Sequence, residues 1–208
     1  MHKQGYKVEV CIDNYSDAMY ALNKGADQLE VCSSLHLDGL TPDIKLVEKL
    51  IRKTSKELKV MIRPRSGNFI YTSLEKSIMR QQVEKFSALG ILHFVTGMLL
   101  EDHTIDIMGM HDLSNNLDVI FTFHKAIDSV RCIPDQLDNL SQVKNVKYIL
   151  SSGGKNTAAE GKEVLKILVY NYKDRFKIIP AGKITSKNLN DIHSYIGAEY
   201  YHGKKILG

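Results

Sequence analysis

Short runs of apolar residues, several of them alternating with polar residues, recur along the chain, and each predicts a β-strand. There are eight such runs, and they begin at Lys7, Asp27, Lys59, Ile91, Asp118, Val146, Arg175 and Ala198. Between them, apolar residues return every three or four positions, which predicts amphipathic helices. The helix over 44–51 follows Thr41-Pro42-Asp43, so Thr41 is the expected N-cap of that helix.

Strands that alternate with helices predict a parallel sheet with both faces covered. Eight such units are the number that closes a TIM-type (β/α)8 barrel, and 208 residues lie near the lower size limit of that fold. Only six residues follow His202, which leaves no room for a full eighth helix. The expected fold class is therefore a compact α/β barrel, with residues 1–208 forming a single domain. An open doubly wound sheet is the alternative.

Composition narrows the class of protein. Apolar residues make up 43% and charged residues 25%, as in soluble globular domains. The net charge of +4 is spread along the chain and forms no basic stripe with interleaved aromatic residues, so a nucleic-acid partner is not expected. There is no apolar run near the roughly 18 residues of a membrane span, and the first residues lack a signal-peptide layout. We therefore expect a cytoplasmic protein that uses no membrane.

The alternation also predicts which side chains enter the barrel. In the first strand Val8, Val10 and Ile12 would face the helices, which sends Glu9 and Cys11 inward. The same rule sends inward Glu30 and Cys32, Met61 and Arg63, Thr122 and His124, and Tyr200 and His202. Unpaired ions inside a protein cost several kcal/mol, so we expect Glu9 and Glu30 to share Arg63. Arg63→Ala would then destabilise the fold by roughly 3–5 kcal/mol.

Several motifs resemble the CutC family of copper homeostasis proteins. They are VEVCID at Val8, GADQLEVCSSL at Gly25, GLTP at Gly39, VMIRPRSGNFIY at Val60, TFHKAID at Thr122 and SSGGKNTAAEG at Ser151. The resemblance extends over essentially the whole chain. It implies a TIM-type barrel, a cytoplasmic location and a homodimer or larger homo-oligomer. It also implies a role in copper handling, with copper held as Cu(I) by Cys11 and Cys32.

The sequence departs from the family pattern at a few positions. Lys125 and Ile127 stand where the family usually has Arg and Phe. Ala181-Gly182-Lys183 replaces the family's glycine-rich run after the seventh strand, which weakens the expectation of a phosphate-like pocket there. The cysteine and arginine positions match the family.

The residues themselves leave three functions open. The first is binding of Cu(I) by Cys11 and Cys32. Cu(I) is soft and prefers sulfur, and adjacent strands lie about 4.8 Å apart, although inward residues of neighbouring strands are staggered. The second reading is an enzyme acting on a small anionic ligand. Its catalytic candidates are Glu9, Glu30, Arg63, His124 and Asp128, and its binding candidates are Arg65, Ser152, Gly153 and Gly154. The third is a scaffold that self-associates through the edge left by the missing helix. Cys132 is placed outside the site, and an odd count of three cysteines argues against disulfides.

Overall fold

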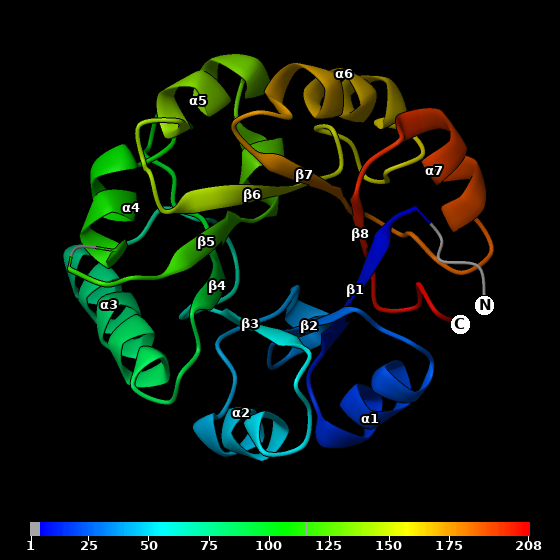
Figure 1. Cartoon of the computed structure of the whole chain (residues 1–208). Coiled ribbons are helices and arrows are strands. Elements are labelled where there is room, and N and C mark those ends of the chain that lie inside the picture. The colour runs from blue at the N-terminus through cyan, green and yellow to red at the C-terminus, as the bar shows by residue number, and fades with distance from the viewer. Residues whose placement is uncertain (1–4, 115) are drawn as a thin grey trace.

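Eight strands and the helices that connect them alternate along the chain (Figure 1). The computed structural model describes residues 5–114 and 116–208. Its strands are β1 (Lys7–Ile12), β2 (Gln28–Val31), β3 (Glu57–Met61), β4 (His93–Thr96), β5 (Ile120–Phe123), β6 (Val146–Ser151), β7 (Lys177–Pro180) and β8 (Tyr200–His202). Each of the eight predicted runs contains or overlaps one of these strands.

The strands form a barrel. All recorded strand pairs are parallel, and the ladder runs β7-β6-β5-β4-β3-β2-β1-β8. β1 pairs with both β2 and β8, so the first and last strands of the chain are neighbours. β7 and β8 lie side by side at the seam, and a single parallel bridge between Thr185 and Lys205 joins the segments beyond them (Figure 1). The TIM-type barrel is therefore confirmed, and the open sheet is excluded.

The helices surround the barrel as an outer ring (Figure 1). They are α1 (Tyr15–Asn23), α2 (Ile44–Ile51), α3 (Ser73–Ser87), α4 (Ile107–Ser114), α5 (Ile133–Leu140), α6 (Lys162–Tyr172) and α7 (Leu189–Ile196), with 3-10 turns η1 (Leu35–Leu37) and η2 (Lys125–Ser129). No helix follows β8 in the described residues up to Gly208. Ile206, after β8, is buried in the main hydrophobic core.

The N-cap of α2 differs from the prediction. Asp43, not Thr41, caps this helix through a bond from the Lys45 N–H to its carboxylate. The Thr41 hydroxyl instead accepts the backbone N–H of Arg63 at 2.9 Å and donates to Gln82 at 3.0 Å. Thr41 therefore ties the loop after β2 to the end of β3, a tertiary contact that a local capping rule does not include.

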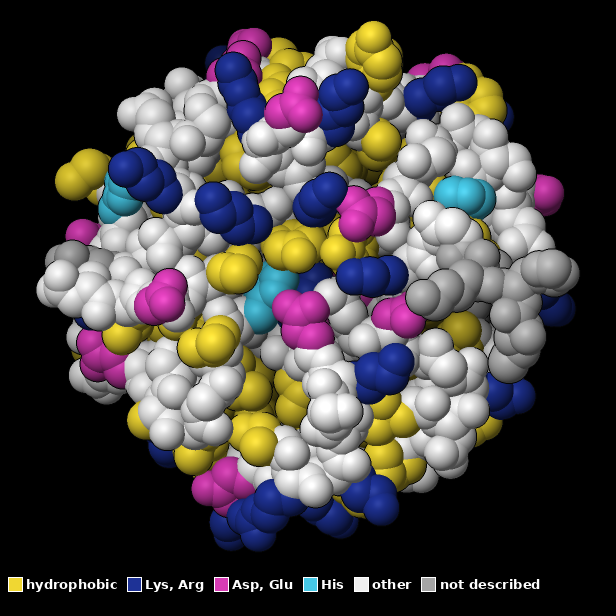
Figure 2. All heavy atoms as spheres, viewed as in Figure 1, with side chains coloured by type: hydrophobic (Ala, Val, Ile, Leu, Met, Phe, Trp, Pro, Cys, Tyr) yellow, Lys and Arg dark blue, Asp and Glu magenta, His cyan; other side chains and the backbone are white. Residues whose placement is uncertain are grey.

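The outward side chains of the strands pack against the helices as alternation predicts. Val8, Val10, Leu29, Val31 and Val60 are all buried in the main core cluster. Among the described residues, no helix has both the length and the apolar character that a membrane crossing requires. On the face shown in Figure 2, hydrophobic side chains lie around the centre together with a histidine and with acidic and basic side chains.

Candidate functional site at the barrel mouth

A cavity of about 610 Å³ opens where the strands end. It is lined by residues at or just after the carboxyl ends of seven of the eight strands, all but β4, including Cys11, Glu30, Arg63, His124 and His202. Active sites of TIM-type barrels lie at this end, because the loops there vary while the strands hold them in place. The volume lies within the range of small-molecule sites, roughly 300–1,000 Å³.

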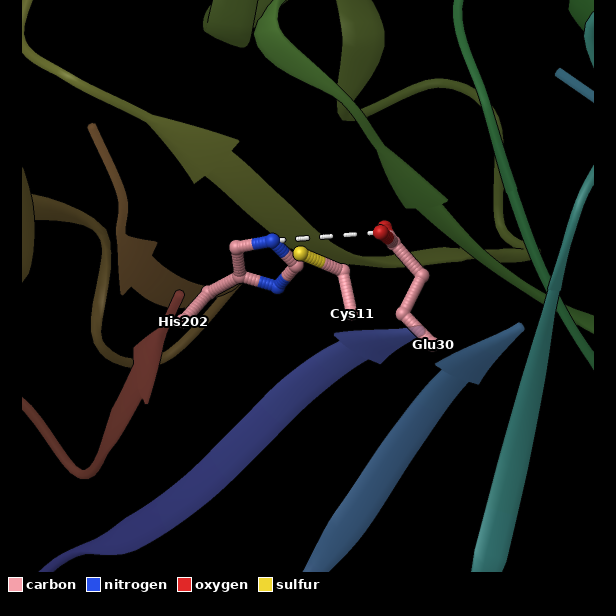
Figure 3. Close-up of side chains that lie close together, drawn as sticks. All are labelled: Cys11, Glu30 and His202. Atoms are coloured by element: carbon pink, nitrogen blue, oxygen red, sulfur yellow. Dashed lines mark ion pairs between the residues drawn. The ribbon is translucent and has the colours of Figure 1, made fainter. Parts of the chain in front are cut away.

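Three chemically reactive side chains converge in this cavity: Cys11, Glu30 and His202 (Figure 3). They come from the neighbouring strands β1, β2 and β8, and the register places Cys11 beside Glu30. One ligand atom of each residue lies within 4.8 Å of the others. Glu30 and His202 are buried, and Cys11 is half-buried. These three donor types can together hold a metal ion.

His202 connects two carboxylates. Its Nδ1 lies 2.7 Å from Glu9 Oε1, and its Nε2 lies 3.8 Å from Glu30 Oε2. Burial alone would lower the pKa of His202, but the charge of Glu30 and the sulfur of Cys11 raise it well above its usual value. The raised pKa favours the imidazolium form of His202 between the two carboxyl groups.

Cys32 is staggered relative to Cys11, as barrel geometry predicts. Cys11 pairs in register with Glu30, and Cys32 follows two residues later. The Cys32 thiol donates to Glu30 Oε2 at 3.4 Å. Burial and the nearby Glu30 carboxylate raise the pKa of Cys32 well above its usual value, and burial also raises the pKa of Glu30. The Glu30 carboxyl group thus stands beside both cysteines.

Below this cluster lies a buried ion pair. Lys59 Nζ lies 2.5 Å from Glu9 Oε2, and both side chains are fully buried. Burial alone would raise the pKa of Glu9, but Lys59 and His202 hold it well below its usual range. Lys59 also lies over the ring of Tyr148, 4.5 Å from its centroid. The predicted sharing of Arg63 by Glu9 and Glu30 is therefore wrong: Lys59 and His202 compensate these acids.

Arg63 binds main-chain carbonyls instead. Its guanidinium donates to the carbonyl oxygens of Leu37, Gly39 and Gly67 at 3.0, 3.2 and 3.1 Å. The guanidinium also lies over the ring of Phe69, 5.0 Å from its centroid. Because η1 and the loop after β3 both reach it, Arg63 holds two loops at the edge of the mouth.

His124 begins the loop after β5 and is buried. Burial and the charge of Arg63 lower its pKa to about 3, so the ring is neutral near pH 7. The Ala126 N–H donates to His124 Nδ1 at 3.2 Å, which leaves the proton on Nε2. Phe69 packs against the same ring, with centroids 4.7 Å apart.

The turn after β6 binds a carboxylate of the chain itself, that of Asp128, and it does not open a helix, because α6 begins only at Lys162. The Asp128 carboxylate accepts the N–H groups of Ser152 and Gly154, each at 2.9 Å, and the Ser151 hydroxyl at 2.6 Å. Gly153 stands at φ +71°, a left-handed conformation that favours glycine. An external anion at Ser152–Gly154 would therefore compete with this carboxylate.

Arg65 also has a partner. Its Nε donates to Glu75 at 2.6 Å, and its guanidinium donates to the carbonyl oxygens of Ser66, Asn68 and Ile70. Arg65 does not line the mouth cavity. The structure thus brings Cys11, Glu30, Arg63, His124 and Asp128 to one cavity and places Arg65 beside it.

Comparison with known proteins decides the family. The CutC family model matches residues 6–207. The chain belongs to the CutC family. It is 37% identical to a CutC protein of Histophilus somni over 87% of this chain and 74% of the relative. It is 33% identical to the copper homeostasis protein cutC homolog of Homo sapiens over 95% of this chain and 72% of the relative.

A crystal structure of CutC from Streptococcus agalactiae has the same architecture. It superposes with a TM-score of 0.89 at 26% identity and covers 97% of this chain and 99% of that chain. Membership of the CutC family and the barrel fold therefore agree with the resemblance seen in the motifs.

In this CutC barrel, sequence reasoning missed Lys59. The rule that faces Val60 and Ile62 outward also sends Lys59 inward, so the signal was present in the alternation. His93 was missed too; its Nδ1 lies 2.7 Å from Glu57 and its Nε2 lies 2.9 Å from Thr122. His202 was expected to face inward, but its place beside Cys11 depends on β8 pairing with β1.

Proposed function

We propose that this CutC family member handles copper by binding Cu(I) at the barrel mouth. The observation that carries the proposal is the convergence of Cys11, Glu30 and His202, whose ligand atoms lie within 4.8 Å of one another. The family supports the choice of metal, since a relative is named a copper homeostasis protein. Cu(I) prefers sulfur and also accepts imidazole nitrogen, and the cluster offers both.

Cys11 and His202 are the ligands that this geometry favours, with Cys32 as a second sulfur. Glu9 accepts the Nδ1 proton of His202, which leaves Nε2 to face Cys11 and Glu30. A carboxylate behind a ligating histidine is the usual device for fixing its orientation. The Glu30 carboxylate is a hard donor and a poor match for Cu(I). Its place beside both sulfurs suits it to accept the thiol protons that binding displaces.

Anaerobic titration with Cu(I) against a competing chelator tests the proposal. The chain should bind one Cu(I), and Cys11→Ser should lower the affinity by roughly 10–100-fold or more, because a soft ligand is replaced by a hard one. Cys32→Ser should weaken binding less, and the two changes together should abolish it. Cys132→Ser is the matched control, because this third cysteine is exposed. Unchanged stoichiometry and affinity in the double variant would overturn the proposal.

A second candidate function is a barrel enzyme acting on a small anionic substrate. The observation that favours it is the cavity of about 610 Å³, which is far larger than one ion requires. Glu30 and His202 are its acid–base candidates. Turnover of a small anion that Cys11→Ser leaves intact and Glu30→Gln abolishes would support it.

Location and assembly are also proposals: a cytoplasmic protein that forms a homodimer or larger homo-oligomer. A monomer in light scattering at high protein concentration would contradict the assembly.

A further inference from the structure

Three buried residues of the mouth cavity each have one polar atom that lacks a hydrogen-bond partner among the described residues. These atoms are Glu30 Oε1, Arg63 Nε and His124 Nε2. The three residues are only 3–4% exposed. Buried polar atoms are normally hydrogen-bonded, so a cluster of unpaired ones in a single cavity indicates a partner from outside the chain.

Two of the three groups are donors. Arg63 is always charged, and its guanidinium binds three carbonyl oxygens and interacts with the Tyr71 hydroxyl, while its Nε–H makes no hydrogen bond of good geometry among the described residues. The Ala126 N–H occupies His124 Nδ1, so Nε2 carries a proton. Phe69 packs against both groups and limits their contact with water. Donors in such a site favour an anionic acceptor, because low local polarity strengthens the interaction.

Four lysines outnumber two aspartates, Asp38 and Asp128, around the cavity. Lys125, Lys155, Lys183 and Lys204 line it, and within the described part of the chain none of the four forms an ion pair. Asp128 also lines it, but its carboxylate is bound by the turn after β6. Lysines attract phosphate and carboxylate groups as point charges.

We propose that the mouth cavity binds a small organic anion that carries a phosphate or carboxylate group and a hydroxyl group. The positive charges of Arg63 and of the rim lysines attract the anionic group, and small side-chain movements on binding bring the buried Nε–H of Arg63, the Nε2–H of His124 and Glu30 Oε1 into contact with the ligand. The cavity volume of about 610 Å³ suits such a molecule. The proposal does not depend on Cu(I), because its donors are different residues from the proposed metal ligands.

Isothermal titration calorimetry of the whole, copper-free chain tests the inference. The probes are glycerol 3-phosphate and malate, which distinguish the two anionic groups, with glycerol as the neutral control. At least one anion should bind with a Kd of roughly 10 mM or tighter, and glycerol should not bind. Failure of both anions would overturn the proposal and would leave the Cu(I) titration unaffected.

Two variants locate the binding. His124→Phe removes the donor and keeps a ring, and it should weaken anion binding about tenfold or more. Lys183→Met lies on the rim and should weaken binding severalfold, more at low salt than at high salt. Lys173→Met is the charge-matched control, because Lys173 lines a separate groove between α6 and α7. Equal affinity in all three variants and the unaltered chain would overturn the site, even if an anion binds.

Discussion

The two ends of the barrel interior are both polar, but they differ in how their charges are compensated. At the lower end, Lys59 forms an ion pair with Glu9 at 2.5 Å, and His93, whose pKa burial lowers, is hydrogen-bonded to Glu57 at 2.7 Å. At the mouth, Glu30, Arg63 and His124 each have an unpaired polar atom and line a cavity. Compensated charges fill a barrel as a structural core, whereas unpaired polar atoms around an open volume indicate ligand binding. The same strand alternation thus produces a structural layer and a functional one.

The largest expected effect lies in the lower layer. Lys59→Met removes the cation from a fully buried pair and should destabilise the fold by roughly 3–5 kcal/mol, measured by urea unfolding. The double variant Glu9→Gln with Lys59→Met should recover part of this loss, because no uncompensated charge is left. A loss below about 1 kcal/mol in the single variant would show that the pair is not the structural centre of this layer.

A pH-dependent effect of intermediate size is expected at His124. Its pKa is about 3 in the fold and about 6.5 when unfolded, so below pH 6.5 the unfolded chain binds a proton that the folded chain does not. Stability should therefore fall by about 1.4 kcal/mol per pH unit from this residue between pH 6 and pH 4. His124→Phe should flatten that slope, and His111→Phe, at an exposed position of α4, should not. The measurement is the free energy of unfolding at several pH values. If it changes with pH equally in the unaltered chain and in His124→Phe, the His124 ring is not buried in its neutral form.

The smallest expected effect is the coupling between Glu9 and Arg63, which shows whether Arg63 or Lys59 compensates the charge of Glu9. Glu9 and Arg63 have no common partner, so a double-mutant cycle with Glu9→Gln and Arg63→Met should give a coupling within about 0.5 kcal/mol of zero. A double-mutant cycle with Glu9→Gln and Lys59→Met should give a coupling energy well above about 0.5 kcal/mol. A large coupling between Glu9 and Arg63 would restore the charge network expected from the sequence.

Much of the fold followed from local pattern. The alternation around Val8, Val10 and Ile12 located the first strand and sent Glu9 and Cys11 to the interior. Helix and strand periods are local properties of the chain, which is why residue types alone were enough.

The partners within the site could not be predicted in the same way. Arg63 was expected to point inward just after β3, but two of its three carbonyl partners lie 24 and 26 residues away in sequence. His202 meets Cys11 only because the barrel closes between β8 and β1. Asp128 and the turn after β6 were both chosen as site residues, yet only the structure pairs them. Such contacts depend on loop paths and closure, which no local rule contains.

We propose that the mouth, and not the lower end of the barrel, binds Cu(I) through Cys11. X-ray absorption at the copper K-edge of the Cu(I)-loaded chain distinguishes the two, with Cys132→Ser as the matched control. We expect sulfur and imidazole nitrogen neighbours of copper in the unaltered chain and in the control, and loss of a sulfur neighbour in Cys11→Ser. An identical sulfur coordination in Cys11→Ser would exclude Cys11 as a ligand.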